Sequence, residues 1–449
     1  MTPPKPASRP DNVSLWRYLR LFRRDILSAQ PQRLYRAWMA EFRTPFFRSY
    51  LINQPDLIRT VLKERPLDFP KSDRVSEGLR PLLGNAVFLT NGATWQSQRR
   101  IIDPAFEGGR LRDVFSPMLA AAEAAVDRLN SGSEVTEIEE FSSHVAADII
   151  FRTLFSIPIS HHIAKQVFAE FRAYQRSQPI LNLAAFVPLP RWFPRFHRRA
   201  TKNSAANIRK MITRLTQERI EAIRNGCAPD DLATKIMTQA DPETGRRFGA
   251  KEMVDQVAIF FLAGHETSAA ALAWALYLIA LCPEHQERLA AEVSSLPETP
   301  DFADISRLKF TRNVFREALR LYPPVPMMVR QTTCPERFRD RRLSRGSQVV
   351  ISPWHLHRHE RLWTNPDAFD PDRFATDDGQ KSLRDAFIPF SAGARVCPGA
   401  GFAMLEGPLL LALLVRRYKF ITVPGREPVV QAHLTVRSKD GIWLRVEAR

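Results

Sequence analysis

Glycine and cysteine are both scarce in this chain, which has 18 glycines and 4 cysteines among 449 residues. So little glycine excludes glycine-rich repeats, whereas 34 prolines predict many helix ends. The cysteines are too few and too far apart for a disulfide framework, and no C-x-x-C pair is present for zinc. We therefore expect a globular protein in a reducing cytoplasm. The cysteines are Cys227, Cys282, Cys334 and Cys397.

Long hydrophobic runs are also missing. The N-terminus has no apolar h-region, so we predict no signal peptide. The longest uncharged stretch, 267–282, is shorter than the roughly 20 residues of a bilayer span. His265 and Glu266 directly precede it and are costly in lipid. This stretch therefore predicts a buried helix inside a soluble protein.

Positive charge is in excess, because Lys plus Arg number 65 and Asp plus Glu number 48, a net charge of +17. Such a charge suits nucleic acid, a membrane surface or an acidic protein, and it does not choose among them. Residues 1–30 are a basic amphipathic segment, which either lies on a membrane or packs as a first helix on its own domain. Its apolar residues are Leu15, Leu19, Phe22 and Ile26, and its arginines are Arg17, Arg20, Arg23 and Arg24.

Helical patterns dominate the rest of the chain. Helices are predicted at 110–130, 138–155, 161–176 and 200–225, and one very long helix at 252–282 ends at Pro283. Residues 66–92 are rich in turn formers and predict a loop, while residues 325–352 alternate in a way that predicts a small sheet. No linker divides the sequence. We predict one domain over 1–449, mainly α with a small β region.

The segment Phe390–Gly399 is the most informative part of the sequence. A single cysteine, Cys397, lies between glycines and just before the apolar helix predicted at 400–417. The helix N-terminus and the nearby Arg395 would lower the pKa of the Cys397 thiol. A buried structural cysteine is the plainer alternative. A Cys–His nucleophile is another, although no histidine is near in sequence.

This segment resembles F-x-x-G-x-R-x-C-x-G, the haem-ligand loop of the cytochrome P450 family. The resemblance implies that haem b is the cofactor and that the Cys397 thiolate is the axial ligand of its iron. It also implies that Gly393 and Gly399 let the backbone approach the porphyrin and turn. Phe390 would pack beneath the ring, and Arg395 would pair with a haem propionate.

Two further motifs of the same family stand in the expected order. Glu317 and Arg320 form an E-x-x-R on a helix, and a later P-x-R-F segment contains Arg373. By resemblance these three residues form a buried structural network that holds the cysteine loop. Trp95 and Arg99 match the family's W-x-x-x-R and would reach a haem propionate.

Arg330, which follows the proline-rich turn after the E-x-x-R, is by the same resemblance a candidate for the other haem propionate. The long helix carries A-G-x-E-T at 263–267. Without the resemblance, this is a kinked buried helix in which the Thr267 hydroxyl bonds back to a carbonyl. With the resemblance, the helix opens to leave a groove for dioxygen, Thr267 relays protons, and Glu266 supplies them from solvent. His265 occupies the family's variable position and receives no role.

The resemblance implies a bacterial-type soluble monooxygenase that inserts one atom of O2 into a small hydrophobic substrate, such as a fatty acid or terpenoid. Electrons would come from a separate ferredoxin-type partner, because the chain ends shortly after Cys397 and contains no flavin or nicotinamide domain. Candidate partner contacts are Arg100, Arg110, Arg112, Lys381 and Arg384.

Other outcomes stay open. A haem-thiolate enzyme can instead catalyse desaturation, ring coupling or a peroxide-driven oxidation, although Glu266 and Thr267 favour the monooxygenase. A non-enzymatic nucleic-acid binder explains the charge but not the cysteine loop, and no nucleic-acid motif is visible, so we expect no nucleic-acid partner. The apolar stretch 180–196 is either a substrate entrance that touches membrane or a packed loop.

Overall fold

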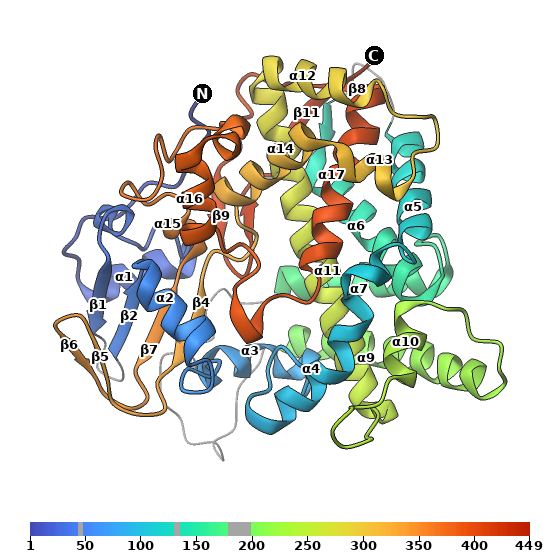
Figure 1. The fold of residues 1–449 in the computed structure, drawn as a ribbon, viewed down its shortest axis with the longest axis horizontal. Helices are drawn as coiled ribbons and strands as arrows, with labels where there is room; N and C mark the ends of the chain where they lie inside the picture. The colour runs from blue at the N-terminus through green and yellow to red at the C-terminus, as the bar shows by residue number, and fades with distance from the viewer. Residues whose placement is uncertain (44–47, 130–134, 178–198) are drawn as a thin grey trace.

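A sheet region and a larger helical region form the fold (Figure 1). The computed structural model describes residues 1–43, 48–129, 135–177 and 199–449, so the proposed entrance at 180–196 lies outside the described residues. Helices dominate and the sheets are small, which confirms the predicted mainly α fold with a small β region.

The helices agree with most of the predicted ranges. The longer ones are α1 (Leu15–Arg24), α3 (Asp73–Leu83), α4 (Gly92–Phe106), α5 (Phe115–Arg128), α6 (Ile138–Phe155), α7 (His162–Ser177), α9 (Arg199–Arg224), α11 (Ala250–Leu281), α12 (Pro283–Val293), α14 (Lys309–Leu321), α16 (Asp377–Ala386) and α17 (Ala400–Arg417). The short ones are α2 (Pro55–Arg59), α10 (Leu232–Thr238), α13 (Phe302–Arg307), α15 (Pro353–Leu356), η1 (Gln32–Tyr35), η2 (Thr60–Glu64), η3 (Gly108–Leu111), η4 (Pro371–Ala375) and η5 (Gly393–Arg395).

The largest sheet joins the start of the chain to the predicted sheet at 325–352. Its order is β1-β2-β7-β4, with β2 and β7 parallel and the other pairs antiparallel. In the parallel pair Ile52 lies opposite Ile351, and both side chains are fully buried. The strands are β1 (Met39–Arg43), β2 (Arg48–Ile52), β3 (Val135–Glu137), β4 (Met328–Gln331), β5 (Glu336–Phe338), β6 (Arg341–Leu343), β7 (Gln348–Ile351), β8 (Tyr418–Thr422), β9 (Val430–Ala432), β10 (Val436–Ser438) and β11 (Trp443–Ala448).

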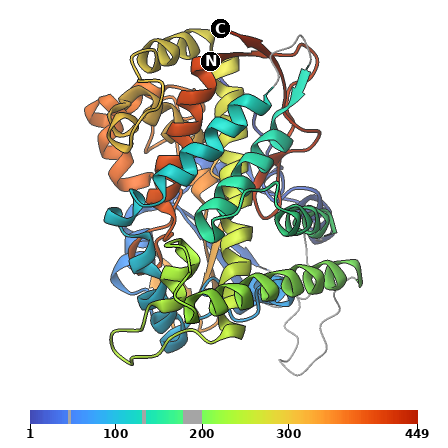
Figure 2. The same cartoon turned by 90° about the vertical axis from the view of Figure 1, so that its right-hand side faces the viewer.

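Helix α11 is the axis of the helical region. Its 32 residues extend for about 48 Å, and α6, α9, α14 and α17 pack around it (Figure 2). By length and composition it passes as a membrane span, but 72% of its most apolar window is buried by the rest of the chain. The prediction of a buried helix at this place agrees with that burial.

The predicted loop at 66–92 was wrong in part, because α3 occupies its middle. Gly78 and Pro81 lower the helix propensity of this stretch and hide it from sequence patterns. The helix forms because Leu79, Leu82 and Leu83 are buried in the main core, so tertiary packing outweighs local propensity.

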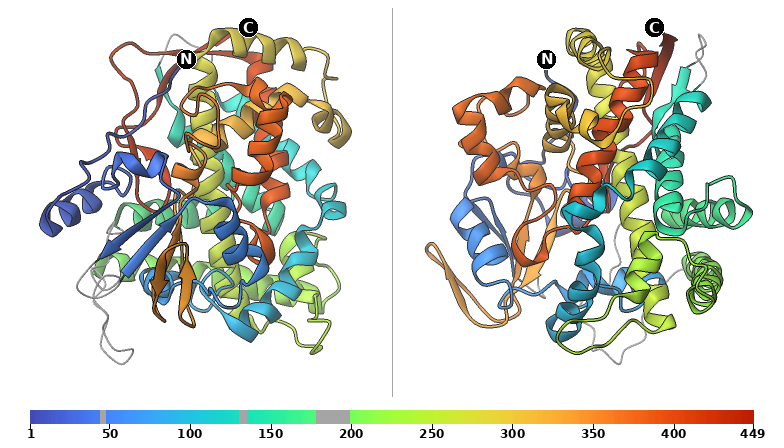
Figure 3. Two further views of the ribbon diagram at one scale, coloured as in Figure 1. Left: turned by 60° about the vertical axis from the view of Figure 1, so that its left-hand side comes forward. Right: turned by 45° about the vertical axis from the view of Figure 1, so that its right-hand side comes forward.

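Helix α1 stands at the edge of the molecule, where it is the blue helix at the left of the left-hand view in Figure 3. None of its residues is buried. Its Phe22 packs against the main core, and Leu15 and Leu19 line the large cavity described below. Leu19 and Phe22 of the apolar face that the sequence identified are therefore partly covered by the protein, whereas Leu15 is 43% exposed.

Candidate active site

The cysteine loop runs from Phe390 into the N-terminus of α17. The backbone N–H of Cys397 donates to the Phe390 carbonyl at 2.9 Å, and the Ala400 N–H donates to the Cys397 carbonyl at 3.2 Å. These bonds fold the loop back on itself and direct Cys397 into the large cavity, whose wall it joins.

Gly393 has a packing role in the structure, which differs from the approach to the porphyrin that the resemblance implied. Its φ is +66°, and a Cβ there would lie 2.0 Å from the Leu62 carbonyl oxygen in η2. Glycine is therefore required because the loop packs on η2. Gly399 has an ordinary φ of −80°, and a Cβ would meet only the Cys397 Sγ, at 3.8 Å.

The Cys397 thiol is exposed because it opens into the cavity, yet protein surrounds it closely. Burial raises the pKa of this thiol above its usual value, while the Gly399 backbone N–H and the Arg99 charge act in the opposite direction. The protein alone therefore does not give the Cys397 thiol the lowered pKa that the sequence predicted. Coordination to a metal ion deprotonates such a thiol outright.

A cluster of four cations also lines the cavity wall, and we call it the cation cluster. It consists of Lys71, Arg99, Arg330 and Arg395. Arg330 and Arg395 are 6% and 9% exposed, and the Nε atom of each has no hydrogen-bond partner. Among the described residues, no carboxylate pairs with Lys71, Arg330 or Arg395.

Burial and mutual repulsion act on the pKa values of the cation cluster. Burial, and then Arg395, lowers the pKa of Arg330 to about 10. Burial, and then Arg99, lowers that of Arg395 to about 10 as well. For Lys71, burial and then the three arginines lower the pKa to about 6. Unpaired buried cations are costly, so this wall fits an anionic ligand.

The W-x-x-x-R residues lie beside this cluster on α4. The Trp95 ring is buried, with the Arg395 guanidinium 4.3 Å and the Lys71 ammonium 6.0 Å from its centroid. Arg99 donates from Nη1 to the Val396 carbonyl at 2.7 Å and pairs through Nε with Asp103. Arg99 therefore connects α4 to the cysteine loop.

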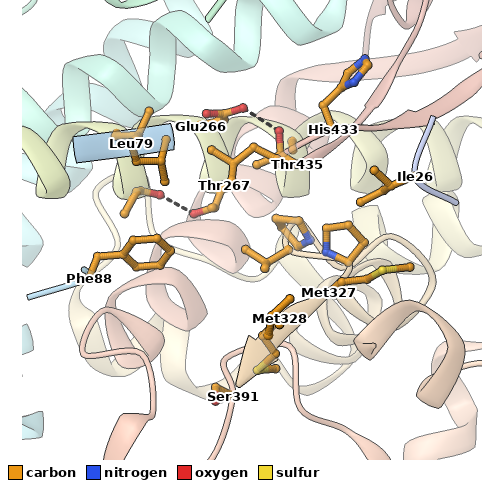
Figure 4. A pocket seen from close by; sticks show the side chains of 18 of the residues that line it. Ile26, Leu79, Phe88, Glu266, Thr267, Met327, Met328, Ser391, His433 and Thr435 are labelled. Atoms are coloured by element: carbon orange, nitrogen blue, oxygen red, sulfur yellow. Dashed lines mark hydrogen bonds between the residues drawn. The ribbon is translucent and has the colours of Figure 1, made fainter. Parts of the chain in front are cut away.

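Thr267 and Glu266 leave α11 in different directions (Figure 4). Thr267 faces the cavity, and its Oγ1 donates to the Ala263 carbonyl at 2.6 Å. Glu266 is 7% exposed; its Oε1 accepts a hydrogen bond from Thr435 at 2.6 Å and lies 3.1 Å from Arg437 Nη2. The carboxylate is therefore held by the C-terminal part of the chain.

Helix α11 is assigned as one helix from Ala250 to Leu281, and its turn at Ala263, Gly264 and Thr267 lines the cavity. Gly264 packs against α6, since a Cβ there would lie 2.4 Å from Ile150 Cδ1 and would displace the end of that side chain. His265 points away into a buried site, where its Nε2 lies 2.6 Å from Ser143 Oγ.

The predicted network of Glu317, Arg320 and Arg373 is assembled as one buried unit. Arg320 binds Glu317 through two hydrogen bonds of 2.7 Å, and Arg373 Nε adds a third of 2.9 Å. Burial by itself would raise the pKa of Glu317, but the two arginines outweigh it and hold this pKa below its ordinary value. The remaining guanidinium donors bind backbone carbonyls between His357 and Ala368.

His357 connects this network to the cysteine loop. Its Nδ1 lies 3.2 Å from the Arg320 carbonyl, and its Nε2 accepts from the Ile388 backbone N–H at 2.9 Å. Ile388 is two residues before Phe390, whose carbonyl holds the Cys397 N–H. Hydrogen bonds and a short piece of backbone, Ile388 to Phe390, thus connect Arg320 to Cys397.

One cavity, of about 2350 Å³, brings most of these groups together. Cys397, the cation cluster, Trp95, Phe390, Gly399 and Thr267 line it, whereas Glu317, Arg320, Arg373 and Gly393 lie outside its wall. Figure 4 shows Thr267 above its middle, with Leu79 and Phe88 on one side and Met327 and Ile26 on the other. The thiol and the unpaired arginines fit a ligand that carries both a metal ion and carboxylates.

Sequence reasoning missed several members of this site. Lys71 stands alone in a stretch without periodicity, and Thr435 and Arg437 follow Glu266 only after a long intervening sequence. Glu406, on α17, accepts from Ser268 at 2.5 Å, and burial raises its pKa to about 8. Of these residues, only Glu406 could have been singled out from the sequence. It lies in an apolar helix, and a carboxyl group buried there needs a hydrogen-bond or ion-pair partner.

Comparisons with known proteins agree with these observations. The family profile described as "Cytochrome P450" matches residues 32–444. Cyclooctatin synthase of Streptomyces melanosporofaciens is 32% identical over 395 residues, which are 86% of this chain and 84% of that protein. Cyclooctat-9-en-7-ol 5-monooxygenase of the same organism is 30% identical, covering 86% and 83%. Human cytochrome P450 4A11 is 32% identical, covering 87% and 78%.

Proposed function

This chain belongs to the cytochrome P450 family, and we propose that it is a haem-thiolate monooxygenase that oxidises a small, mostly hydrocarbon substrate. The observation that carries this proposal is the shared cavity, in which a thiol, three cations without a carboxylate partner among the described residues and a threonine on α11 all face the same space. The three cations are Lys71, Arg330 and Arg395. The enzyme class follows from the family, and the roles below are our proposals.

Haem b fits the donors in this cavity. Cys397 would be the ligand of its iron, and Arg330, Arg395, Trp95 and Arg99 would hold its propionates, with Phe390 packing beneath the ring. Gly393 keeps the loop packed on η2, and the lack of a side chain at Gly399 would let the backbone approach the porphyrin. When bound, haem supplies the activation of dioxygen and the insertion of one oxygen atom into a C–H bond, which the thiolate favours.

We assign proton delivery to Glu266 and Thr267. Arg437 is half-exposed and binds Glu266, which directly precedes Thr267 on α11, so this carboxylate connects a half-exposed side chain to the turn that carries Thr267. The Thr267 hydroxyl donates to Ala263 and keeps its oxygen lone pairs directed away from that carbonyl. In this role it would exchange that bond for one to the reacting dioxygen and pass a proton to it.

The substrate class is proposed from the apolar part of the cavity. Leu79, Phe88, Phe260 and Met327 line it away from the cations, and they suit a fatty-acid or terpenoid skeleton. The printed name of one relative, cyclooctat-9-en-7-ol 5-monooxygenase, supports a largely hydrocarbon substrate with few polar groups.

We propose a cytoplasmic enzyme that receives electrons from a separate acidic ferredoxin. The cysteine side of the cavity supports this, because Leu111 of η3 lies 3.0 Å from where a Gly401 Cβ would be, which places Arg110 and Arg112 beside the start of α17. Lys381 and Arg384 on α16 are also exposed. Arg100 is a poorer candidate than the sequence indicated, because it pairs with Asp241 and Glu243.

The experiment that tests the proposed reaction compares Thr267→Ala with Thr267→Ser in a reconstituted system. A panel of fatty acids and terpene alcohols is offered under isotopically labelled dioxygen with a ferredoxin and its reductase. The wild type should place one labelled oxygen atom in the product. Thr267→Ala should consume NAD(P)H but release more peroxide and less product, and Thr267→Ser should restore the coupling.

Equal coupling in all three proteins would remove Thr267 from the reaction. Product formed from peroxide alone, at the rate seen with ferredoxin, would instead favour the peroxide-driven alternative. Charge reversal at Arg112 tests the partner separately. It should slow ferredoxin-dependent reduction at low salt and leave substrate binding unchanged.

A further inference from the structure

Helix α6 presents a second carboxyl group to the cavity. Glu139 lines the cavity wall together with Glu266, and its Oε1 accepts a hydrogen bond from the Ser438 backbone N–H at 2.8 Å. The residue before Ser438 is Arg437, whose Nη2 lies 3.1 Å from Glu266 Oε1. Consecutive residues of β10 therefore hold two carboxyl groups, one from α6 and the other from α11.

The side of α6 that carries Glu139 is turned toward the part of α11 that carries Glu266. Ser143, four residues after Glu139, also lines the cavity, and its Oγ lies 2.6 Å from His265 Nε2. Residues four apart share one face of a helix, and His265 directly precedes Glu266. The contact with His265 therefore brings the face of Glu139 beside the turn of α11 that contains Glu266. Figure 4 shows Glu266 on that turn, where it is hydrogen-bonded to Thr435.

The charged groups that face Glu139 come from several elements. Burial raises the pKa of Glu139 to about 7, although a backbone N–H and Arg437 of β10 oppose this rise, and Glu137 on β3 adds to it. Glu140, the next residue on α6, is exposed and pairs with Arg172 on α7 at 2.6 Å. Glu139 can therefore both bind and release a proton near neutral pH, where an ordinary glutamate stays ionised.

We propose that Glu139 supplies protons to Glu266, a step that rests on the proton delivery proposed above for Glu266 and Thr267. The proposed reaction consumes dioxygen with two electrons and two protons, places one oxygen atom in the substrate and releases the other as water. In this step the Glu139 carboxyl group gives its proton to the Glu266 carboxylate through water in the cavity that both residues line. Glu139, which is partly exposed, then takes a new proton from solvent, and Arg437 stays charged throughout.

The plainer alternative is that Glu139 only anchors β10 through Ser438. The variant Glu139→Gln separates the two roles, because the glutamine side-chain oxygen still accepts from the Ser438 N–H but the amide cannot release a proton. An anchor tolerates this change at every pH. A proton supplier does not, and the change matters most below pH 7, where Glu139 carries its proton.

The test compares the full haem-loaded wild type with Glu139→Gln in the reconstituted ferredoxin system, from about pH 6 to about pH 8. At the acidic end the variant should form several-fold less product per NAD(P)H and release more peroxide. This difference should shrink as pH rises through 7, because Glu139 of the wild type then loses its own proton. Infrared spectra of the resting proteins give a readout apart from activity. The wild type should show a protonated carboxyl band that fades over the same pH range and that the variant lacks.

The matched control is Glu140→Gln, which removes the exposed carboxylate next along α6 and should match the wild type at every pH. Equal effects of the two variants would reduce the result to a lost negative charge and overturn the proposal. So would a missing infrared band, or loss of the reduced carbon monoxide band in Glu139→Gln, which would indicate an anchor. Uncoupling by Glu266→Gln with normal coupling in Glu139→Gln would overturn this inference alone. Normal coupling in Glu266→Gln would overturn it together with the proposed role of Glu266.

Discussion

Two groups of buried arginines flank the cysteine loop, and they differ in what balances their charge. In the network of Glu317, Arg320 and Arg373, a carboxylate and a set of backbone carbonyls accept the guanidinium donors. In the cation cluster, Arg330 and Arg395 each keep an Nε without a partner. Both groups are buried, yet only the first is balanced by the chain itself.

This difference separates a structural role from a ligand-binding role. A buried ion pair that is fully hydrogen-bonded is strongly destabilised when one partner is removed, because the other charge stays behind in the interior. A buried cation without a partner already carries that cost, and only an external anion relieves it. The comparison predicts that mutations in the first group damage the fold, whereas mutations in the second damage cofactor retention.

Cys397 gives the largest effect on the ligand-binding side. Cys397→Ala should abolish the strongly red-shifted Soret band of the reduced carbon monoxide adduct, because no other thiol lines the cavity wall among the described residues. Urea unfolding of the cofactor-free variant should stay close to the wild type, since the thiol faces the cavity and its removal leaves no buried charge behind. A persistent red-shifted band would show that another group is the ligand.

Glu317→Gln should give the largest loss of stability. It removes the anion between Arg320 and Arg373, so we expect the free energy of unfolding of the cofactor-free protein to fall by about 3–5 kcal/mol. The control is Glu287→Gln, whose ion pair with Arg449 is exposed and should be worth at most about 1 kcal/mol. Similar losses in the two variants would contradict the structural role of the network.

Arg395→Leu should produce the reverse pattern. We expect the cofactor-free protein to keep its stability within about 1 kcal/mol, because the change removes an unbalanced buried charge. Haem should transfer to an excess of a haem-accepting globin roughly tenfold to a hundredfold faster, since a hydrogen bond to a charged group is lost. Arg361→Leu at the surface should change neither quantity. Loss of stability without faster release would place Arg395 with the structural group.

Sequence patterns predicted one of these groups better than the other. The network can be recognised in the sequence from fixed residue spacings. The glutamate and arginine of an E-x-x-R lie on one face of a helix, so they can form an ion pair without any contact from another segment. The cation cluster gathers Lys71 from a segment without periodicity, Arg330 from β4 and Arg395 from the cysteine loop. That no carboxylate of the described residues pairs with Lys71, Arg330 or Arg395 becomes evident only when these segments are folded together.

Contacts between segments that are distant in sequence also limit the prediction of other parts of the fold. The long apolar run around α11 predicts a buried helix whatever segments pack against it. The observed helix begins two residues before the predicted start. Helix α3 was missed because its burial, not its composition, stabilises it. Thr435 and Arg437, which hold Glu266, come from the far end of the chain, and no local pattern relates the two regions.

Lys71 gives the sharpest test of the comparison, because its effect on stability depends on pH. In the cofactor-free protein its pKa is lowered to about 6, chiefly by burial, whereas an unfolded lysine titrates near 10.4. Between these values the unfolded chain binds one more proton than the folded chain. The contribution of Lys71 is therefore unfavourable at neutral pH, and the free energy of unfolding rises as pH rises from 6 toward 10.

Lys71→Met should remove this slope. We expect the free energy of unfolding of the cofactor-free wild type, measured relative to the variant, to increase between pH 7 and pH 9 by at most about 1.4 kcal/mol per pH unit. With haem bound, the propionates would raise the pKa of Lys71 again and the relative slope should vanish. Parallel pH profiles without haem would mean that the Lys71 ammonium is not desolvated by its surroundings. A slope that persists with haem would mean that no anion reaches the cation cluster, and the contrast between the two groups of buried arginines would then be lost.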